Sequence, residues 1–266
     1  MSFLRYMTIK SFSFYNPDWV INIVHNNKRA NNTWISSEEQ DNVNYKGHDF
    51  REELSGIPNL ILVPLDSIFL IDYSTMSNIH IKDILNWYLL SIKSCVVADM
   101  DIIFCQPINK SEGIDWNSHI NLCNFDFFSN YIPVSFMASD VMDDNKNKFF
   151  DEVYQNSVRN YNPRIYESCG TKSITYPSIY VISEHFKDLK VNKMDHMIVF
   201  PFTSPNPNNA TPMCWLKDNS HLFTSNTIGV HWYGGNPMSQ IHNNKITKDN
   251  FQNFNNTITN IIKKII

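Results

Sequence analysis

The sequence is poor in glycine and has no excess of positive charge. It holds 7 glycines among 266 residues and carries a formal net charge of −4. No stretch rich in Pro, Gly and Ser separates one part of the chain from another, and no internal repeat appears, so the sequence favours one domain over residues 1–266. The charge provides no basic surface for a polyanion, and we therefore expect no nucleic-acid partner.

Paired cysteines are also missing. The five cysteines are Cys95, Cys105, Cys123, Cys169 and Cys214. None belongs to a Cys-x-x-Cys pair or to a Cys/His cluster, which argues against a zinc centre and against a disulfide framework. We expect these residues to be free, buried thiols.

No apolar run is long enough to cross a bilayer. The longest run, "NLILVPLDSIFLIDY" at residues 59–73, is interrupted by Pro64 and Asp66. The first residues, "MSFLRYMTIKSF", are amphipathic rather than signal-like. We therefore expect a cytoplasmic protein with no transmembrane segment. The amphipathic stretch 250–266 predicts a helix that packs on the body, with peripheral membrane contact as the alternative.

Hydrophobic residues make up 42% of the chain, and their spacing predicts helices alternating with strands. Such alternation favours the α/β fold class. The helices are expected at 3–15, where Asn16-Pro17 ends the first of them, and at 79–92, 147–161 and 250–266. The strands are expected at 20–24, 59–65, 94–104, 197–202 and 227–231, with two more within 125–139. Residues 25–56 are polar and predict a long surface excursion.

Two aspartates interrupt a hydrophobic strand in "SCVVADMDIIFCQPI", residues 94–108. At a period of two, Asp99 and Asp101 would project to the same side of that strand. Two carboxylates held so close repel each other unless a cation joins them, and hard divalent ions prefer carboxylate oxygens. Mg²⁺ and Mn²⁺ keep other coordination positions for water and phosphate oxygens. The pattern therefore suggests a metal–diphosphate site, although an Asp-x-Asp also occurs by chance.

A second unusual stretch is "TIGVHWYGGNP", residues 227–237, which contains three of the seven glycines, two of them as the pair Gly234-Gly235. His231 follows an apolar run and is either a core histidine or a third metal ligand. Trp232 and Tyr233 either stack on a sugar or base or fill the core. The residues alone leave these alternatives open.

Four segments carry a pattern that spans most of the chain. They are "TIKSFSFYNPDWVINIV", "IHIKDILNWYLLSIKSCVVADMDIIFCQPI", "YIPVSFMASD" followed by "NKFFDEVY", and "TIGVHWYGG". In this order they resemble glycosyltransferases with a DXD-containing sugar-binding region. These are the family-32-like enzymes, related to fungal outer-chain mannosyltransferases and to the glucosylating domains of clostridial toxins.

The resemblance implies a GT-A-like single domain with a mixed, mainly parallel sheet flanked by helices. Residues 1–108 would form the nucleotide and metal half, and residues 109–266 the acceptor-side half with the C-terminal helix. The implied activity is transfer of a sugar from a nucleotide-sugar donor to a glycan or another hydroxyl acceptor. The resemblance favours retention at the anomeric carbon and a Mn²⁺ or Mg²⁺ cofactor.

The resemblance also implies roles for individual residues. Asp99 and Asp101 would hold the metal and the donor diphosphate, and His231 would be a further metal ligand. The other implied donor-binding residues are Asp83, Asn86 and Trp232, where Asn86 occupies the position of a family arginine. No residue of the sequence identifies a catalytic nucleophile or base.

Two other functions remain as alternatives. In the family, a first strand precedes the helix at 3–15, whereas this chain begins at Met1 within that helix. Together with Asn86, this leaves open a catalytically degenerate relative that only binds a carbohydrate or nucleotide. A metal-dependent phosphoesterase or nuclease is the third hypothesis, and the lack of a basic surface disfavours it.

Overall fold

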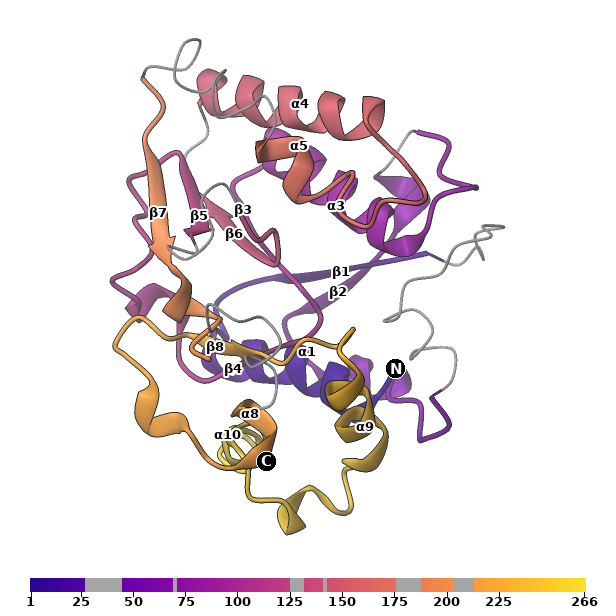
Figure 1. Ribbon diagram of the computed structural model, residues 1–266, viewed down its shortest axis with the longest axis vertical. Helices are drawn as coiled ribbons and strands as arrows, with labels where there is room; N and C mark the ends of the chain where they lie inside the picture. The colour runs from indigo at the N-terminus through magenta and orange to yellow at the C-terminus, as the bar shows by residue number, and fades with distance from the viewer. Residues whose placement is uncertain (27–44, 69–70, 125–131, 141–142, 176–187, 203–212) are drawn as a thin grey trace.

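The computed structural model describes residues 1–26, 45–68, 71–124, 132–140, 143–175, 188–202 and 213–266 (Figure 1). Its helices are α1 (Phe3–Tyr15), α3 (Asn78–Ile92), α4 (Asp144–Arg159), α5 (Thr171–Thr175), α8 (Met213–Leu216), α9 (Pro237–Lys245) and α10 (Thr257–Ile262). Its strands are β1 (Ile21–His25), β2 (Leu60–Pro64), β3 (Cys95–Ala98), β4 (Ile102–Phe104), β5 (Ile120–Asn124), β6 (Phe136–Ser139), β7 (Val191–Asp195) and β8 (Gly229–His231). The predicted α/β class is confirmed.

The strands pair in three groups. β1 and β2 form a parallel pair, β3-β6-β5-β7 form a four-stranded sheet, and β4 pairs with β8. Three of the five pairings among the described strands are antiparallel, so the prediction of a mainly parallel sheet is wrong for them. The two parallel pairs, β1-β2 and β5-β7, are each joined by a long connection, as parallel pairing requires. Hydrophobic runs predict where strands lie but not which strands pair.

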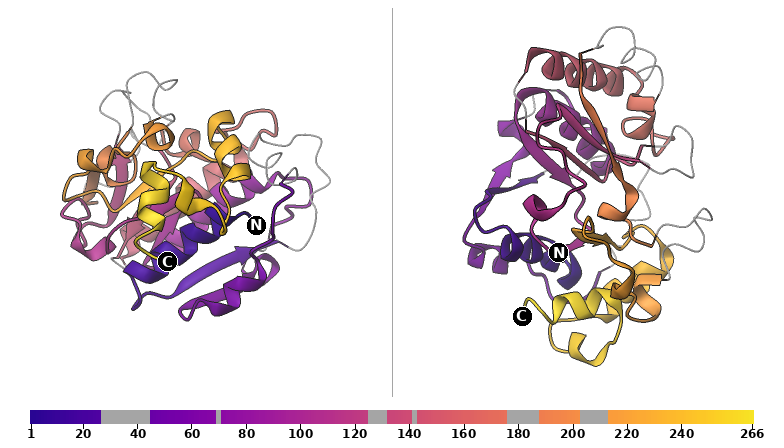
Figure 2. Two further views of the ribbon diagram at one scale, coloured as in Figure 1. Left: turned by 90° about the horizontal axis from the view of Figure 1, so that it is seen from below. Right: turned by 90° about the vertical axis from the view of Figure 1, so that its left-hand side faces the viewer.

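Two layers of helix pack on these strands from opposite ends of the molecule. α3 and α4 cover one face of the four-stranded sheet, where Trp87 of α3 stacks on Phe150 of α4 with ring centroids 6.3 Å apart. α1 lies instead beside the C-terminal helices α9 and α10 (Figure 2). The Oγ of Ser2 donates a hydrogen bond to Asn243 Oδ1 at 2.6 Å, which joins the start of α1 to α9.

Helix α1 ends where the sequence predicts. Asn16 terminates it by donating from Nδ2 to the carbonyl of Phe12 at 3.1 Å, and Pro17 follows. The Oδ1 of Asn16 accepts from the buried N–H of Ile108 at 2.9 Å. Asn59 then donates to the carbonyls of Asn16 and Trp19. The Asn-Pro turn is therefore held to β2 and to the segment after β4.

Other expectations need correction. Residues 197–202 do not form a strand, because Asp195 caps a 3₁₀ turn at His196–Ile198. Residues 198–202 are nevertheless buried, and the carbonyl of Val199 accepts from the N–H of His231 at 2.8 Å. The tail forms a 3₁₀ turn at Phe251–Asn253 and the short helix α10 rather than one long helix, and it packs on the body. The strands β5 and β7 were not predicted.

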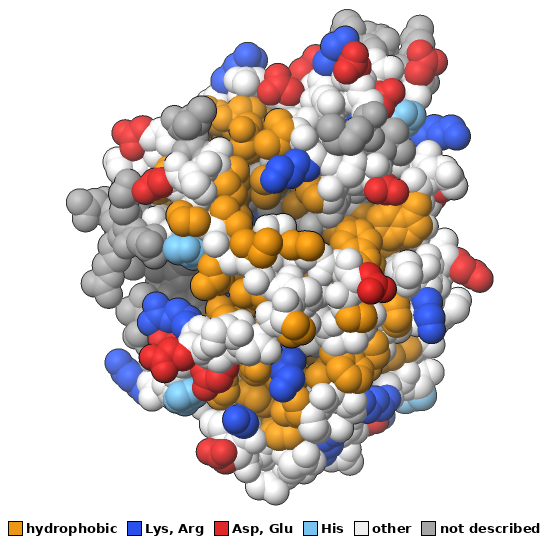
Figure 3. All heavy atoms as spheres, turned by 180° about the vertical axis from the view of Figure 1, so that it is seen from behind, with side chains coloured by type: hydrophobic (Ala, Val, Ile, Leu, Met, Phe, Trp, Pro, Cys, Tyr) orange, Lys and Arg blue, Asp and Glu red, His pale blue; other side chains and the backbone are white. Residues whose placement is uncertain are grey.

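Several expectations fall partly outside the described residues. These are the surface excursion at 25–56 and the first of the two strands within 125–139. The second of those strands is β6. Pro64 ends β2, and Ile61 and Leu62 of this strand are exposed, as expected of an edge strand. Apolar side chains also reach the surface on the face opposite to that of Figure 1 (Figure 3). Within the described residues, no helix has the length and apolar character needed to cross a membrane.

We predict that Asn16→Ala lowers the free energy of unfolding by about 1–3 kcal/mol, because it leaves the buried N–H of Ile108 without an acceptor. Chemical denaturation measures the change. The matched control is Asn22→Ala, at an exposed position of β1, which should change stability by less than about 0.5 kcal/mol. Equal losses in the two variants would contradict the assigned role of Asn16.

Candidate metal site

The acidic pair lies in the turn that joins two sheets. β3 ends at Ala98 in the four-stranded sheet, and the N–H of Asp99 still bonds to the carbonyl of Ser135 at 2.8 Å. β4 begins at Ile102, whose partner in β8 is His231. The expected single strand with both carboxylates on one face is therefore wrong, because the chain changes sheets between them. The side chains converge through the turn and the β4–β8 pairing instead.

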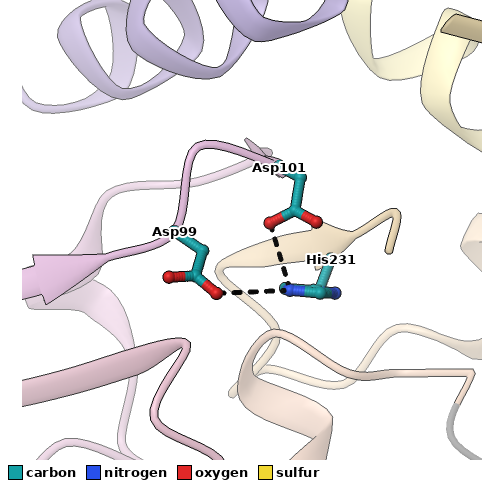
Figure 4. Close-up of side chains that lie close together, drawn as sticks. All are labelled: Asp99, Asp101 and His231. Carbon is teal, nitrogen blue, oxygen red and sulfur yellow. Dashed lines mark ion pairs between the residues drawn. The ribbon is translucent and has the colours of Figure 1, made fainter. Parts of the chain in front are cut away.

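Asp99, Asp101 and His231 form one compact cluster (Figure 4). The Nε2 of His231 lies 3.1 Å from Asp101 Oδ1 and 3.9 Å from Asp99 Oδ2. One ligand atom from each residue lies within 4.8 Å of the other two. Two carboxylate oxygens and one imidazole nitrogen form a donor set that suits Mn²⁺ or Mg²⁺, so the residues fit the expected ion.

The backbone after His231 holds Asp101 in place. The carbonyl of Asp101 accepts from the N–H of Trp232 at 2.9 Å, and its Oδ2 accepts from the N–H of Gly234 at 2.7 Å. Between them, Tyr233 adopts a φ of 53°, a left-handed conformation that costs a non-glycine residue about 1 kcal/mol. A Cβ at position 234 would lie 3.0 Å from Arg5 Nη2 and 3.3 Å from the Trp232 ring, so this approach favours glycine.

The charges of the cluster stabilise one another. Burial alone would raise the pKa of Asp101, but His231, Arg5 and the Gly234 amide hold it well below its usual range. Burial would likewise raise the pKa of Asp99, whereas Lys82 and His231 lower it. Burial alone would lower the pKa of His231, but Asp101 and Asp99 raise it to about 9. Without a metal, two carboxylates and an imidazolium therefore coexist at neutral pH.

Lys82 of α3 extends this cluster to Asp83. Its Nζ lies 2.6 Å from Asp99 Oδ1 and 3.0 Å from Asp83 Oδ1. Burial would lower the pKa of Lys82, but Asp83 and Asp99 raise it well above its usual value. Asp83 is 5% exposed and packs against Gly170, where a Cβ would lie 2.5 Å from Asp83 Oδ2. Burial raises the pKa of Asp83, and Lys82 offsets only part of that rise.

The other predicted donor-binding residues lie differently. Asn86 is half-buried on α3, and no hydrogen bond within the described part of the chain joins it to the cluster. The ring of Trp232 is fully buried and contacts Trp215, with centroids 6.1 Å apart. Trp232 therefore fills the core, which is one of the two alternatives that the sequence left open.

Two residues of this region were not selected as site residues from the sequence. Tyr233 is half-buried, and its ring centroid lies 4.5 Å from that of His231, so it offers an aromatic surface next to the cluster. The sequence suggested stacking for Tyr233 and Trp232 alike and gave no reason to choose between them. The only sequence signal for Lys82 was its position next to Asp83. That signal is weak, because lysines on helices are usually solvated.

Comparisons with known proteins add no family assignment: no protein-family model matches the sequence, and no curated protein matches it either.

We predict that His231 makes the stability of the metal-free protein depend on pH. Its folded pKa of about 9 lies above the ordinary value of 6.5. Its stabilising effect is therefore complete below pH 6.5 and is lost as the pH rises through about 9. Between pH 6.5 and 9.5 in EDTA, the wild type should lose about 1–3 kcal/mol of unfolding free energy relative to His231→Gln. Parallel pH profiles for the two proteins would contradict this.

Proposed function

We propose that the protein is a metal-dependent glycosyltransferase that moves a sugar from a nucleotide-sugar donor to a glycan or another hydroxyl acceptor. The observation that carries the proposal is the convergence of Asp99, Asp101 and His231 at the turn after β3. Three protein ligands would leave coordination positions of Mn²⁺ or Mg²⁺ for the two phosphates of a donor. The proposal also rests on the resemblance of four segments to family-32-like enzymes, and with it we propose a GT-A fold and a retaining transfer.

The chemistry of such a transfer agrees with this cluster. As the bond between sugar and diphosphate breaks, negative charge grows on the leaving nucleoside diphosphate, and a bound divalent ion would neutralise it. The chain's own part is to keep the ligand carboxylates ionised and in position. Before the ion binds, His231 and Arg5 contribute the opposing charge for Asp101, and the amide of Gly234 fixes one of its oxygens. Once His231 binds the ion as a neutral imidazole, Arg5 and the Gly234 amide remain as partners of Asp101.

Tyr233 supports a stacking role close to that ion. Tyr233 is half-buried, and its ring lies against that of His231. Its backbone adopts the left-handed conformation. Residues in sparsely populated backbone conformations occur often at ligand sites, where the surrounding structure holds them in place. We assign to Tyr233 the contact with a donor sugar or base that the sequence suggested for Trp232 or Tyr233.

A second function has one observation in its favour. Lys82 and His231 already balance the charge of Asp99 and Asp101 without an ion. Such a site is compatible with a catalytically degenerate relative that binds a carbohydrate or nucleotide without metal. Binding that is independent of metal would favour this alternative.

We predict that at least one nucleotide sugar raises the melting temperature in Mn²⁺ but not in EDTA. The test is a thermal-shift screen of uridine, guanosine, adenosine and cytidine sugar nucleotides. A donor at 100 times its Kd adds about 2.7 kcal/mol, which is readily detected. The donor that shifts the protein is then assayed for release of its nucleotide, with and without hydroxyl acceptors.

The matched variants are Asp99→Asn at the site and Asp151→Asn at an exposed position of α4. Asp99→Asn should abolish the Mn²⁺-dependent shift, whereas Asp151→Asn should retain it. The glycosyltransferase proposal is wrong if no nucleotide sugar shifts the wild type in Mn²⁺. An equal shift in Mn²⁺ and in EDTA, unaffected by Asp99→Asn, would establish the binding-module alternative instead.

A further inference from the structure

The ammonium group of Lys82 lies against the metal cluster at its more accessible side. It forms ion pairs with Asp99 at 2.6 Å and with Asp83 at 3.0 Å. The Lys82 side chain is 32% exposed, whereas the side chains of Asp83, Asp101 and His231 are 6–8% exposed. Lysine is a flexible point charge, so this ammonium can leave its carboxylates for solvent without unpacking the core.

Lys82 holds an oxygen of a carboxylate that the metal would use. Asp99 Oδ1 contacts Lys82, while Asp99 Oδ2 faces His231 at 3.9 Å. A divalent ion bound to Asp99 would therefore lie within a few ångströms of the ammonium. Two cations at such a distance repel strongly in a site where little water screens them. The ion and the ammonium group cannot both have Asp99 as a close partner at low cost.

We propose that Lys82 is an internal competitor of the metal at Asp99, and that the ammonium group it releases binds a phosphate oxygen of the incoming donor. The inference rests on the proposed function for the nature of that anion. A metal–diphosphate brings two compensating groups at once: the ion takes over Asp99, and the diphosphate gives Lys82 a new partner. The metal alone provides only the first.

The consequence is a positive coupling between metal and diphosphate. Metal binding in isolation places a second cation against Asp99 and weakens the Lys82–Asp99 ion pair, so the affinity for the metal alone is lowered. Diphosphate strengthens metal binding because it accepts the displaced ammonium group, and by linkage the metal strengthens diphosphate binding by the same factor. Lys82 is thus a positioning residue that favours the loaded donor complex over binding of the ion alone.

The experiment measures binding of Mn²⁺ to the full-length protein from the electron paramagnetic resonance signal of the free ion, with and without inorganic pyrophosphate. The variants are Lys82→Met, Lys82→Arg and Lys93→Met. Lys93 is an exposed residue at the end of the same helix, and it controls for a general loss of positive charge. The melting temperature of each variant is measured first, so that a folding defect is not read as a binding defect.

We predict that Lys82→Met binds Mn²⁺ alone about tenfold more tightly than the wild type. This factor corresponds to the lower limit of the free energy of one hydrogen bond to a charged group. With Mn²⁺ saturating, the same variant should bind pyrophosphate about tenfold more weakly. Lys82→Arg should keep both affinities near those of the wild type, since it retains the charge. Lys93→Met should leave both within about twofold.

Unchanged or weaker binding of Mn²⁺ by a folded Lys82→Met protein would overturn the competition, and unchanged pyrophosphate binding would overturn the second role. These failures are distinct from failure of the proposed function. If wild type and Lys82→Met differ as predicted but no nucleotide sugar binds, the competition at Asp99 stands and the glycosyltransferase assignment falls.

Discussion

The antiparallel pairing of β4 with β8 is the constraint on which the site depends. β4 is only three residues long, yet Ile102, Ile103 and Phe104 are all at most 2% exposed. Ile103 packs with α1 and the C-terminal helices, while Ile102 and Phe104 pack on the other side with the core around β5 and β6. Burial on both faces fixes the register, because a slip by one residue would exchange the two sets. That register places His231 opposite Ile102 and hence next to Asp101.

The parts of the fold that local pattern determines were predictable. α1, α3 and α4 each carry an apolar stripe, and Asn16-Pro17 marks the end of α1. The start of α4 was placed at 147, whereas the helix begins at Asp144, where the Asp143 side chain caps it. β7 was missed because "VNKMD" is polar, and its strand conformation comes from pairing with β5. Residues 197–202 were assigned to a strand because burial and strand conformation give the same apolar signal.

The same distinction applies to the site. The chemistry of the Asp99, Asp101 and His231 side chains indicated a metal site, and the structure brings the three together. They converge through a turn and a strand pairing, and not on one face of a single strand as the period-two spacing suggested. Lys82 and Tyr233 could not be assigned in the same way, since their proximity depends on how α3 and the 231–234 segment meet the turn. Trp232 illustrates the converse: its aromatic character suggests a ligand contact, but its position fills the core.

The cluster also shows why a buried acidic site can be stable before any ion binds. A buried carboxylate without a partner is costly, and breaking a buried ion pair destabilises a protein by about 3–5 kcal/mol. Here Lys82, His231 and the Gly234 amide provide the partners of Asp99 and Asp101. The same contacts that stabilise the metal-free cluster must be exchanged when a metal binds, so stability without the ion and affinity for it oppose each other.

The groups that set this opposition come from segments far apart in the sequence. Arg5 belongs to α1, lies 5.6 Å from the ring centroid of Trp232 and lowers the pKa of Asp101. α1 shares one core with Trp232 and with Ile258, Ile261 and Ile262 of α10. The portions 1–108 and 109–266 therefore do not form separate cores. A core substitution in α10 can change the site through Trp232 and Arg5 without touching a ligand.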